Sequence, residues 1–112
     1  MNRRTFALAL SIAVAALLAP RLALAEDHLA QAISHTKEAI ESGKKGQADV
    51  LVTHSEVALT HANAAEKEKA NPHTKEGITH LNAAIAEGKK KDAAAATGHA
   101  KEALTHLEAA TK

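Results

Sequence analysis

The stretch HTKEGITHLNAAIAEGKKKD, from His73 to Asp92, shows how the whole chain is organised. Ile78, Leu81 and Ile85 are spaced three or four residues apart, which places them on one face of a helix. Alanine, glutamate and lysine are common between them, and all three favour helix. Gly88 begins a glycine-lysine-lysine run and is expected to end the helix. The stretch therefore predicts an amphipathic helix followed by a turn.

The same pattern occurs 45 residues earlier in the chain, as HLAQAISHTKEAIESGKK at residues 28–45. A second helix-length segment follows each copy, and these two segments also align with one another. In them Leu59-Thr60-His61 corresponds to Leu104-Thr105-His106. The chain therefore contains one helical hairpin written twice, at residues 26–70 and 71–112, which together form a single domain.

Residues at the expected helix ends support this interpretation. Asp27, Asn71 and Asp92 are suited to start helices, and proline follows Asn71 at the first helical position. Gly43 and Gly88 are expected to end the first and third helices. We therefore expect an all-α fold, an antiparallel up-down four-helix bundle built from a duplicated helical hairpin.

The first 25 residues have the form of a secretory signal peptide. Arg3 and Arg4 give a positive start, residues 6–18 are apolar, and Ala23-Leu24-Ala25 resembles a cleavage site. Cleavage there would start the mature protein near Glu26 and place it in the periplasm, by the Sec or the twin-arginine route. The alternative is a retained anchor, although the apolar run is shorter than the ~20 residues of a spanning helix.

The composition of residues 26–112 excludes several classes of protein. Eleven lysines face 13 acidic residues, so the net charge is 11 − 13 = −2, whereas nucleic-acid binding needs a basic face. These residues include no cysteine, methionine or aromatic. No serine or cysteine nucleophile stands beside an acid–base pair, so we do not expect an enzyme. Neither nucleic acid nor, after cleavage, a membrane is an expected partner.

The apolar core of this domain is expected to be thin. Residues 26–112 contain 13 leucines, isoleucines and valines but 20 alanines. A core in a domain of ~70–80 residues seldom supplies more than ~3–5 kcal/mol. The sequence therefore predicts a marginally stable fold that a bound ligand could stabilise.

All eight histidines occur in pairs with members seven residues apart. Seven residues make about two helical turns, so both members lie on one stripe, ~10.5 Å apart along the axis. That is too far for one ion with bonds of ~2.0–2.1 Å, so each helix offers separate ligands. We expect the stripes at the boundary between the apolar face and solvent. The pairs are His28 and His35, His54 and His61, His73 and His80, and His99 and His106.

Histidines at equal distances from a turn are expected to face one another if the stripes meet inside each hairpin. The second possibility, a groove between helices two and three with another between four and one, stays open at this point. The facing pairs inside the hairpins would be His35 with His54, His28 with His61, His80 with His99, and His73 with His106.

Three carboxylates lie beside these stripes. Glu76 and Glu102 each stand between the two histidines of their own helix, and Glu38 follows His35 by three residues. Because two of the three acids fall in the second hairpin, we expect that hairpin to bind divalent metal more tightly. Imidazole suits copper, nickel and zinc, and Cu(II) binds most strongly in the usual order, with Ni(II) and Zn(II) as alternatives.

The segments HTKEGITHLNAAIAEGKKKD and GHAKEALTHLEAA, residues 73–92 and 98–110, resemble the small metal-binding protein family of exported bacterial proteins. The resemblance extends over essentially the whole of residues 26–112. It implies a monomeric four-helix bundle that binds several divalent ions, copper foremost, through the eight histidines. One departure is that GKKG and GKKK occupy the turns, where the better-known member carries further histidines. This departure implies a lower capacity for metal.

The sequence thus predicts an exported protein that binds divalent transition metals through paired histidines and acts in metal buffering, scavenging or tolerance. The alternative is a metal-independent helical interaction or stress protein of the periplasm. In that alternative the histidines are ordinary solvated residues at the edge of the core.

Overall fold

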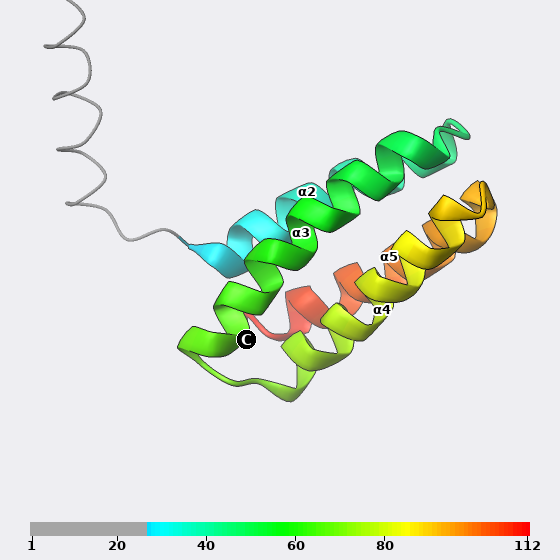
Figure 1. Cartoon of the computed structure of the whole chain (residues 1–112). Coiled ribbons are helices and arrows are strands. Elements are labelled where there is room, and N and C mark those ends of the chain that lie inside the picture. The colour runs from blue at the N-terminus through cyan, green and yellow to red at the C-terminus, as the bar shows by residue number, and fades with distance from the viewer. Residues whose placement is uncertain (1–26) are drawn as a thin grey trace, which may run out of the picture.

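The computed structural model describes residues 27–112, which form four α-helices and confirm the expected all-α bundle (Figure 1). Helices α2 and α3 form the first hairpin, and α4 and α5 form the second. Each helix packs against its chain neighbour, and α2 also packs against α5, which closes the bundle. Both hairpin turns lie at the same end. The bounds are α2 His28–Lys44, α3 Ala48–Glu68, α4 Pro72–Lys89 and α5 Ala93–Ala109.

Three of the four helices begin at the capping residues expected from the sequence. The side chain of Asp27 accepts a hydrogen bond from the backbone N–H of Ala30, and Asp92 accepts one from Ala95, each at 3.0 Å. Asn71 caps α4 in the same way, before the proline at the first helical position. At the start of α3, by contrast, the side chain of Gln47 makes no capping hydrogen bond.

The helices α2 and α4 do not end at Gly43 and Gly88, as the sequence suggested. Both continue one residue further and end in Schellman turns, in which a residue with positive φ reverses the chain. That residue is Gly46 in the first hairpin (φ 74°) and Lys91 in the second (φ 68°). In the first turn the N–H of Gln47 donates to the carbonyl of Ser42 at 2.9 Å.

Gly43 and Gly88 are instead buried inside their helices because neighbouring helices pack closely against them. A β-carbon on Gly43 would overlap the hydroxyl of Thr97 on α5. A β-carbon on Gly88 would lie 2.5 Å from Val52 Cγ2 on α3. Val52 and Thr97 are 45 residues apart, so the two contacts are equivalent under the duplication and join one hairpin to the other.

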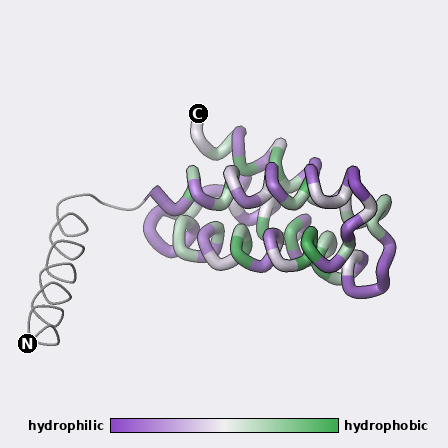
Figure 2. Tube along the Cα trace, turned by 90° about the horizontal axis from the view of Figure 1, so that it is seen from above, coloured by the Kyte–Doolittle hydropathy of each residue, from purple (hydrophilic) through white to green (hydrophobic). Residues whose placement is uncertain are grey.

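The core is as thin as the composition predicted and consists mainly of alanine. Leu51, Leu81 and Leu107 are the large apolar side chains that are fully buried among residues 27–112. Hydrophilic and hydrophobic residues alternate along the helices, and the turn end is hydrophilic (Figure 2). Small side chains let the helices approach closely but bury little apolar surface, so the packing contributes modestly to stability.

None of the described helices is both long enough and apolar enough to cross a membrane. The expected signal peptide, residues 1–25, lies outside the described residues.

Candidate metal centre

The histidine stripes meet inside the hairpins, which resolves the choice that the sequence left open. In each hairpin the two helices turn the same flank toward one another, so histidines from both line a single groove. Seven histidines are half-buried and His73 is exposed. The stripes therefore lie at the edge of the core, where side chains are positioned by packing yet remain accessible to ions.

All four expected cross-helix pairs are present, with ring centroids 5.3–6.1 Å apart. At the open end of the first hairpin, Nδ1 of His28 lies 3.0 Å from Nδ1 of His61. At the same level in the second hairpin, Nδ1 of His73 lies 3.3 Å from Nδ1 of His106. Two nitrogens bound to one ion at ~2.0–2.1 Å stand roughly 2.8–3.4 Å apart, so both pairs have the spacing of shared ligands.

The pairs are also connected to one another along each groove. The ring of His35 stacks on that of His61 at 5.9 Å, with an interplanar angle of 2°. The ring of His80 stacks on that of His106 at 5.6 Å and 6°. Each hairpin therefore holds a continuous zigzag column of four imidazoles, rather than two isolated pairs.

In the first hairpin, Glu38 completes a three-ligand cluster with His35 and His54. Its Oε1 atom lies 3.0 Å from Nδ1 of His35 and 3.4 Å from Nδ1 of His54. Glu38 reaches both rings because it is one turn beyond His35 on α2 and faces α3. Two nitrogens and one oxygen thus lie within 4.8 Å of one another, and they form a donor set suited to a divalent transition metal.

The second hairpin contains two such clusters, and both include His80. One consists of Glu76, His80 and His106, and the other of His80, His99 and Glu102. In each, the three ligand atoms lie within 4.8 Å of one another. The carboxylates are exposed at the surface, so they are free to move toward an ion between the rings.

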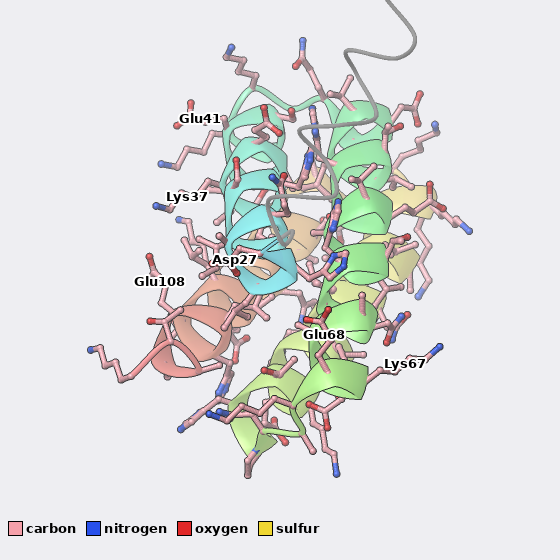
Figure 3. All side chains as sticks on the ribbon, turned by 90° about the vertical axis from the view of Figure 1, so that its left-hand side faces the viewer. Asp27, Lys37, Glu41, Lys67, Glu68 and Glu108 are labelled. Atoms are coloured by element: carbon pink, nitrogen blue, oxygen red, sulfur yellow. The ribbon has the colours of Figure 1, made fainter. Side chains whose placement is uncertain are left out.

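Glu68 is a neighbour of the column that the sequence analysis missed. Its Oε2 atom lies 3.9 Å from Nε2 of His28, and its side chain stands at the end of α3, close to the start of α2 marked by Asp27 (Figure 3). A carboxylate beside one ring nitrogen favours the tautomer in which the other nitrogen is available as a ligand. Glu68 follows His61 by seven residues, so the histidine spacing itself could have identified it.

Two buried ring nitrogens support a fit between these clusters and a metal ion. Nδ1 of His35 and Nδ1 of His99 have no hydrogen-bond partner within residues 27–112. The nearby oxygen of Glu38 lies close to His35 but outside hydrogen-bonding geometry. A buried polar atom without a partner is costly, and a metal ion between these donors would satisfy it. The donor set consists mainly of imidazole, which suits copper, nickel and zinc, with carboxylate oxygens beside it.

The comparisons with known proteins agree with this site. Residues 3–110 match the family described as "Small metal-binding protein", which covers nearly the whole chain. A search of curated proteins found no significant match. The family description and the histidine clusters both indicate metal binding, and neither indicates catalysis. The chain therefore belongs to the small metal-binding protein family.

Proposed function

We propose that the protein is exported and binds divalent transition metals, Cu(II) in particular, as a monomer that buffers or scavenges them. One observation carries this proposal more than any other. His35, His54 and Glu38 bring three ligand atoms together from two helices, with Glu38 Oε1 at 3.0 Å from Nδ1 of His35 and 3.4 Å from Nδ1 of His54. Half-buried imidazoles from two helices that meet beside a carboxylate form a donor set suited to a divalent transition metal.

Copper is favoured by the chemistry of the donors. Imidazole nitrogen and carboxylate oxygen bind Cu(II) more strongly than Ni(II) or Zn(II) at sites of equal geometry. Residues 26–112 contain neither cysteine nor methionine, which are the ligands that select Cu(I). The protein is therefore proposed to act on the oxidised ion, and Ni(II) and Zn(II) are the ions that would compete for the same sites.

Export is proposed from the sequence of residues 1–25. The basic start, the short apolar run and Ala23-Leu24-Ala25 together favour a cleaved signal peptide and a periplasmic location. A buffering protein is useful there because metal ions enter the cell through that compartment. The mass of the protein isolated from a periplasmic fraction tests this part, since cleavage after Ala25 gives a chain that starts at Glu26.

Metal binding is expected to stabilise the fold appreciably because the alanine-rich core supplies little stability. Each cluster joins the two helices of one hairpin, so a bound ion acts as a cross-link between them. An ion at 100 times its dissociation constant adds about 2.7 kcal/mol per site, provided that the unfolded chain does not bind it. A thermal unfolding scan with and without Cu(II) measures this increase.

The decisive experiment is a calorimetric titration with Cu(II) in the presence of a weak competing chelator. The parent protein is compared with a His35→Ala/His54→Ala variant and with Glu41→Gln, a control on the exposed face of α2 (Figure 3). We expect two or more saturable sites in the parent and the control, and one fewer in the double variant. Binding no tighter than that of the chelator would refute the proposal and favour a metal-independent interaction protein.

A further inference from the structure

His80 occupies a position that no histidine of the first hairpin shares. It belongs to both three-ligand clusters of the second hairpin, one with Glu76 and His106 and the other with His99 and Glu102. Its ring lies 5.6 Å from that of His106 and 6.0 Å from that of His99, so it stands between the two histidines of α5. An acid is present on each side of it.

The corresponding residue of the first hairpin, His35, has an acid on one side alone. It too stands between two histidines, His61 at 5.9 Å and His54 at 6.1 Å. Glu38 serves the cluster with His54, whereas the position equivalent to Glu76 is Gln31. In the first hairpin, therefore, a three-ligand cluster is present on one side of His35 alone.

A single imidazole cannot serve two ions at once without losing its remaining proton. A neutral ring has one nitrogen with a free lone pair, and its other nitrogen carries hydrogen. His80 can thus contribute to one of its two clusters at a time. His106 is constrained in the same way, because its Nδ1 atom also lies 3.3 Å from that of His73.

We propose that His80 makes the two metal clusters of the second hairpin mutually exclusive, so that a first divalent ion is distributed between them. This inference rests on the proposed metal-binding function and adds a rule for how the sites fill. A second ion can use the pair His73 and His106 once His106 is released by the first. Its arrival therefore shifts the first ion toward His99 and Glu102. The first hairpin has no such coupling.

The test is Zn(II) binding followed by NMR of protein labelled with ¹⁵N at histidine, because zinc is diamagnetic and each ring reports its own occupancy. At a free Zn(II) concentration that a chelator buffer holds fixed, below saturation of the clusters, the variants Glu76→Gln and Glu102→Gln are compared with the parent. Both glutamates are exposed, so the substitutions leave the helices intact. Glu41→Gln on α2 is the matched control, since that exposed residue belongs to no cluster found within residues 27–112.

The expected result is reciprocal. Glu76→Gln lowers the zinc-induced shift at His106 and raises it at His99, whereas Glu102→Gln does the opposite. If the parent fills both clusters equally, removal of one raises the share of the other up to roughly twofold. The shift at His54 in the first hairpin stays the same in both variants, and the control resembles the parent throughout.

Two results would overturn the inference while leaving the metal-binding function intact. In the first, each substitution lowers the shift at its own histidine and leaves the other histidine unchanged, which means that the clusters are independent. In the second, His99 and His106 saturate together with two ions bridged by a deprotonated His80, which paired Cu(II) ions would reveal by their magnetic coupling. Absence of a Zn(II)-induced shift at every histidine, His54 included, together with no Cu(II) binding tighter than that of the chelator, would instead refute the proposed function itself.

Discussion

The two hairpins carry histidines at the same positions but acids at different ones. Glu38 of the first hairpin corresponds to Ala83 of the second, whereas Glu76 and Glu102 of the second correspond to Gln31 and Val57. The duplicated backbone therefore determines where the imidazoles lie, and the acids determine how the imidazoles are grouped. In the first column the ring of His35 belongs to one cluster, whereas in the second column the ring of His80 belongs to two. The same fold thus presents imidazoles and carboxylates in two different arrangements.

This comparison changes the basis for ranking the hairpins by affinity. The sequence suggested tighter binding in the second hairpin because two acids were identified there and one in the first. The structure adds Glu68 beside His28, so each hairpin has two acids near its column. The number of acids is therefore the same in both hairpins and does not rank their affinities for metal. Tighter binding by the second hairpin stays a prediction, which a titration of each hairpin's sites would test.

The largest effect on metal affinity is expected at His80 and His35, each of which stands between two histidines of the neighbouring helix. His80→Ala removes a ligand from both clusters of the second hairpin. We expect the affinity of that hairpin for Cu(II) to fall by about 100-fold or more, because loss of a direct ligand should cost more than loss of a residue that only supports one. His35→Ala removes one cluster and leaves His28 and His61 in place. Chelator competition measures both, with Thr79→Ala as an exposed neighbouring control. Each variant should lose one ion, because the two clusters that share His80 hold one ion between them and the pair His73 and His106 remains. An undiminished affinity in His80→Ala would contradict the role of His80 as a shared ligand.

The next largest effect concerns the glycines that join the hairpins. Gly43→Ala and Gly88→Ala should each destabilise the fold by about 1–3 kcal/mol through overpacking. We expect Gly43→Ala to cost more because its β-carbon would meet both Thr97 and, at 2.7 Å, Leu51. Gly98→Ala is the control, since nothing lies within 4 Å of its β-carbon, and it should stabilise α5 by about 0.5–1 kcal/mol. Urea unfolding measures all three, and a neutral Gly43→Ala would contradict the close packing.

A smaller effect is expected at the residue with positive φ in each turn, Gly46 in the first hairpin and Lys91 in the second. Gly46→Ala should cost roughly 1 kcal/mol because an L-residue is strained at positive φ. Lys91→Gly relieves the same strain in the second hairpin but also removes the ion pair of Lys91 with Asp49. Exposed pairs contribute about 0–1 kcal/mol, so the net gain should be smaller than the loss at Gly46. Midpoints of thermal unfolding of the two variants should therefore move in opposite directions, and a shared direction would show that the turns are not equivalent.

The smallest effect is expected at the start of α3. Gln47→Asp would give this helix the cap that Asp92 gives α5, and we expect a gain of about 0.5–1 kcal/mol. The reverse substitution, Asp92→Gln, should cost a similar amount. A change in stability for one variant and none for the other would mean that the two turns position their capping residues differently.

Much of this architecture could be predicted because it depends on local patterns. The spacing of Ile78, Leu81 and Ile85 gave the helix, and Asp27 and Asn71 gave helix starts that the structure confirms. The levels of the histidine pairs followed from their distances to the turn. Each of these predictions depends on the sequence of one helix or one hairpin alone, so helical periodicity is sufficient to make it.

The features that were missed depend on contacts between elements. Gly43 and Gly88 looked like helix ends, although each is a point of close contact with the other hairpin, and that contact cannot be read from either helix alone. The choice of groove also required the packing of all four helices. Glu68 is the exception, because its spacing from His61 was visible in the sequence.

The glycine contacts between the hairpins also bear on how such a chain could have arisen. In the whole protein, Gly88 of the second hairpin packs against Val52 of the first. The first hairpin alone contains Val52 and also Gly43, the residue equivalent to Gly88. Two separate copies of residues 27–70, related by a two-fold axis, could therefore place Val52 of each against Gly43 of the other. A symmetric interface of this kind is self-complementary. The present chain thus resembles two copies of one hairpin, joined in a single chain and carrying different acids.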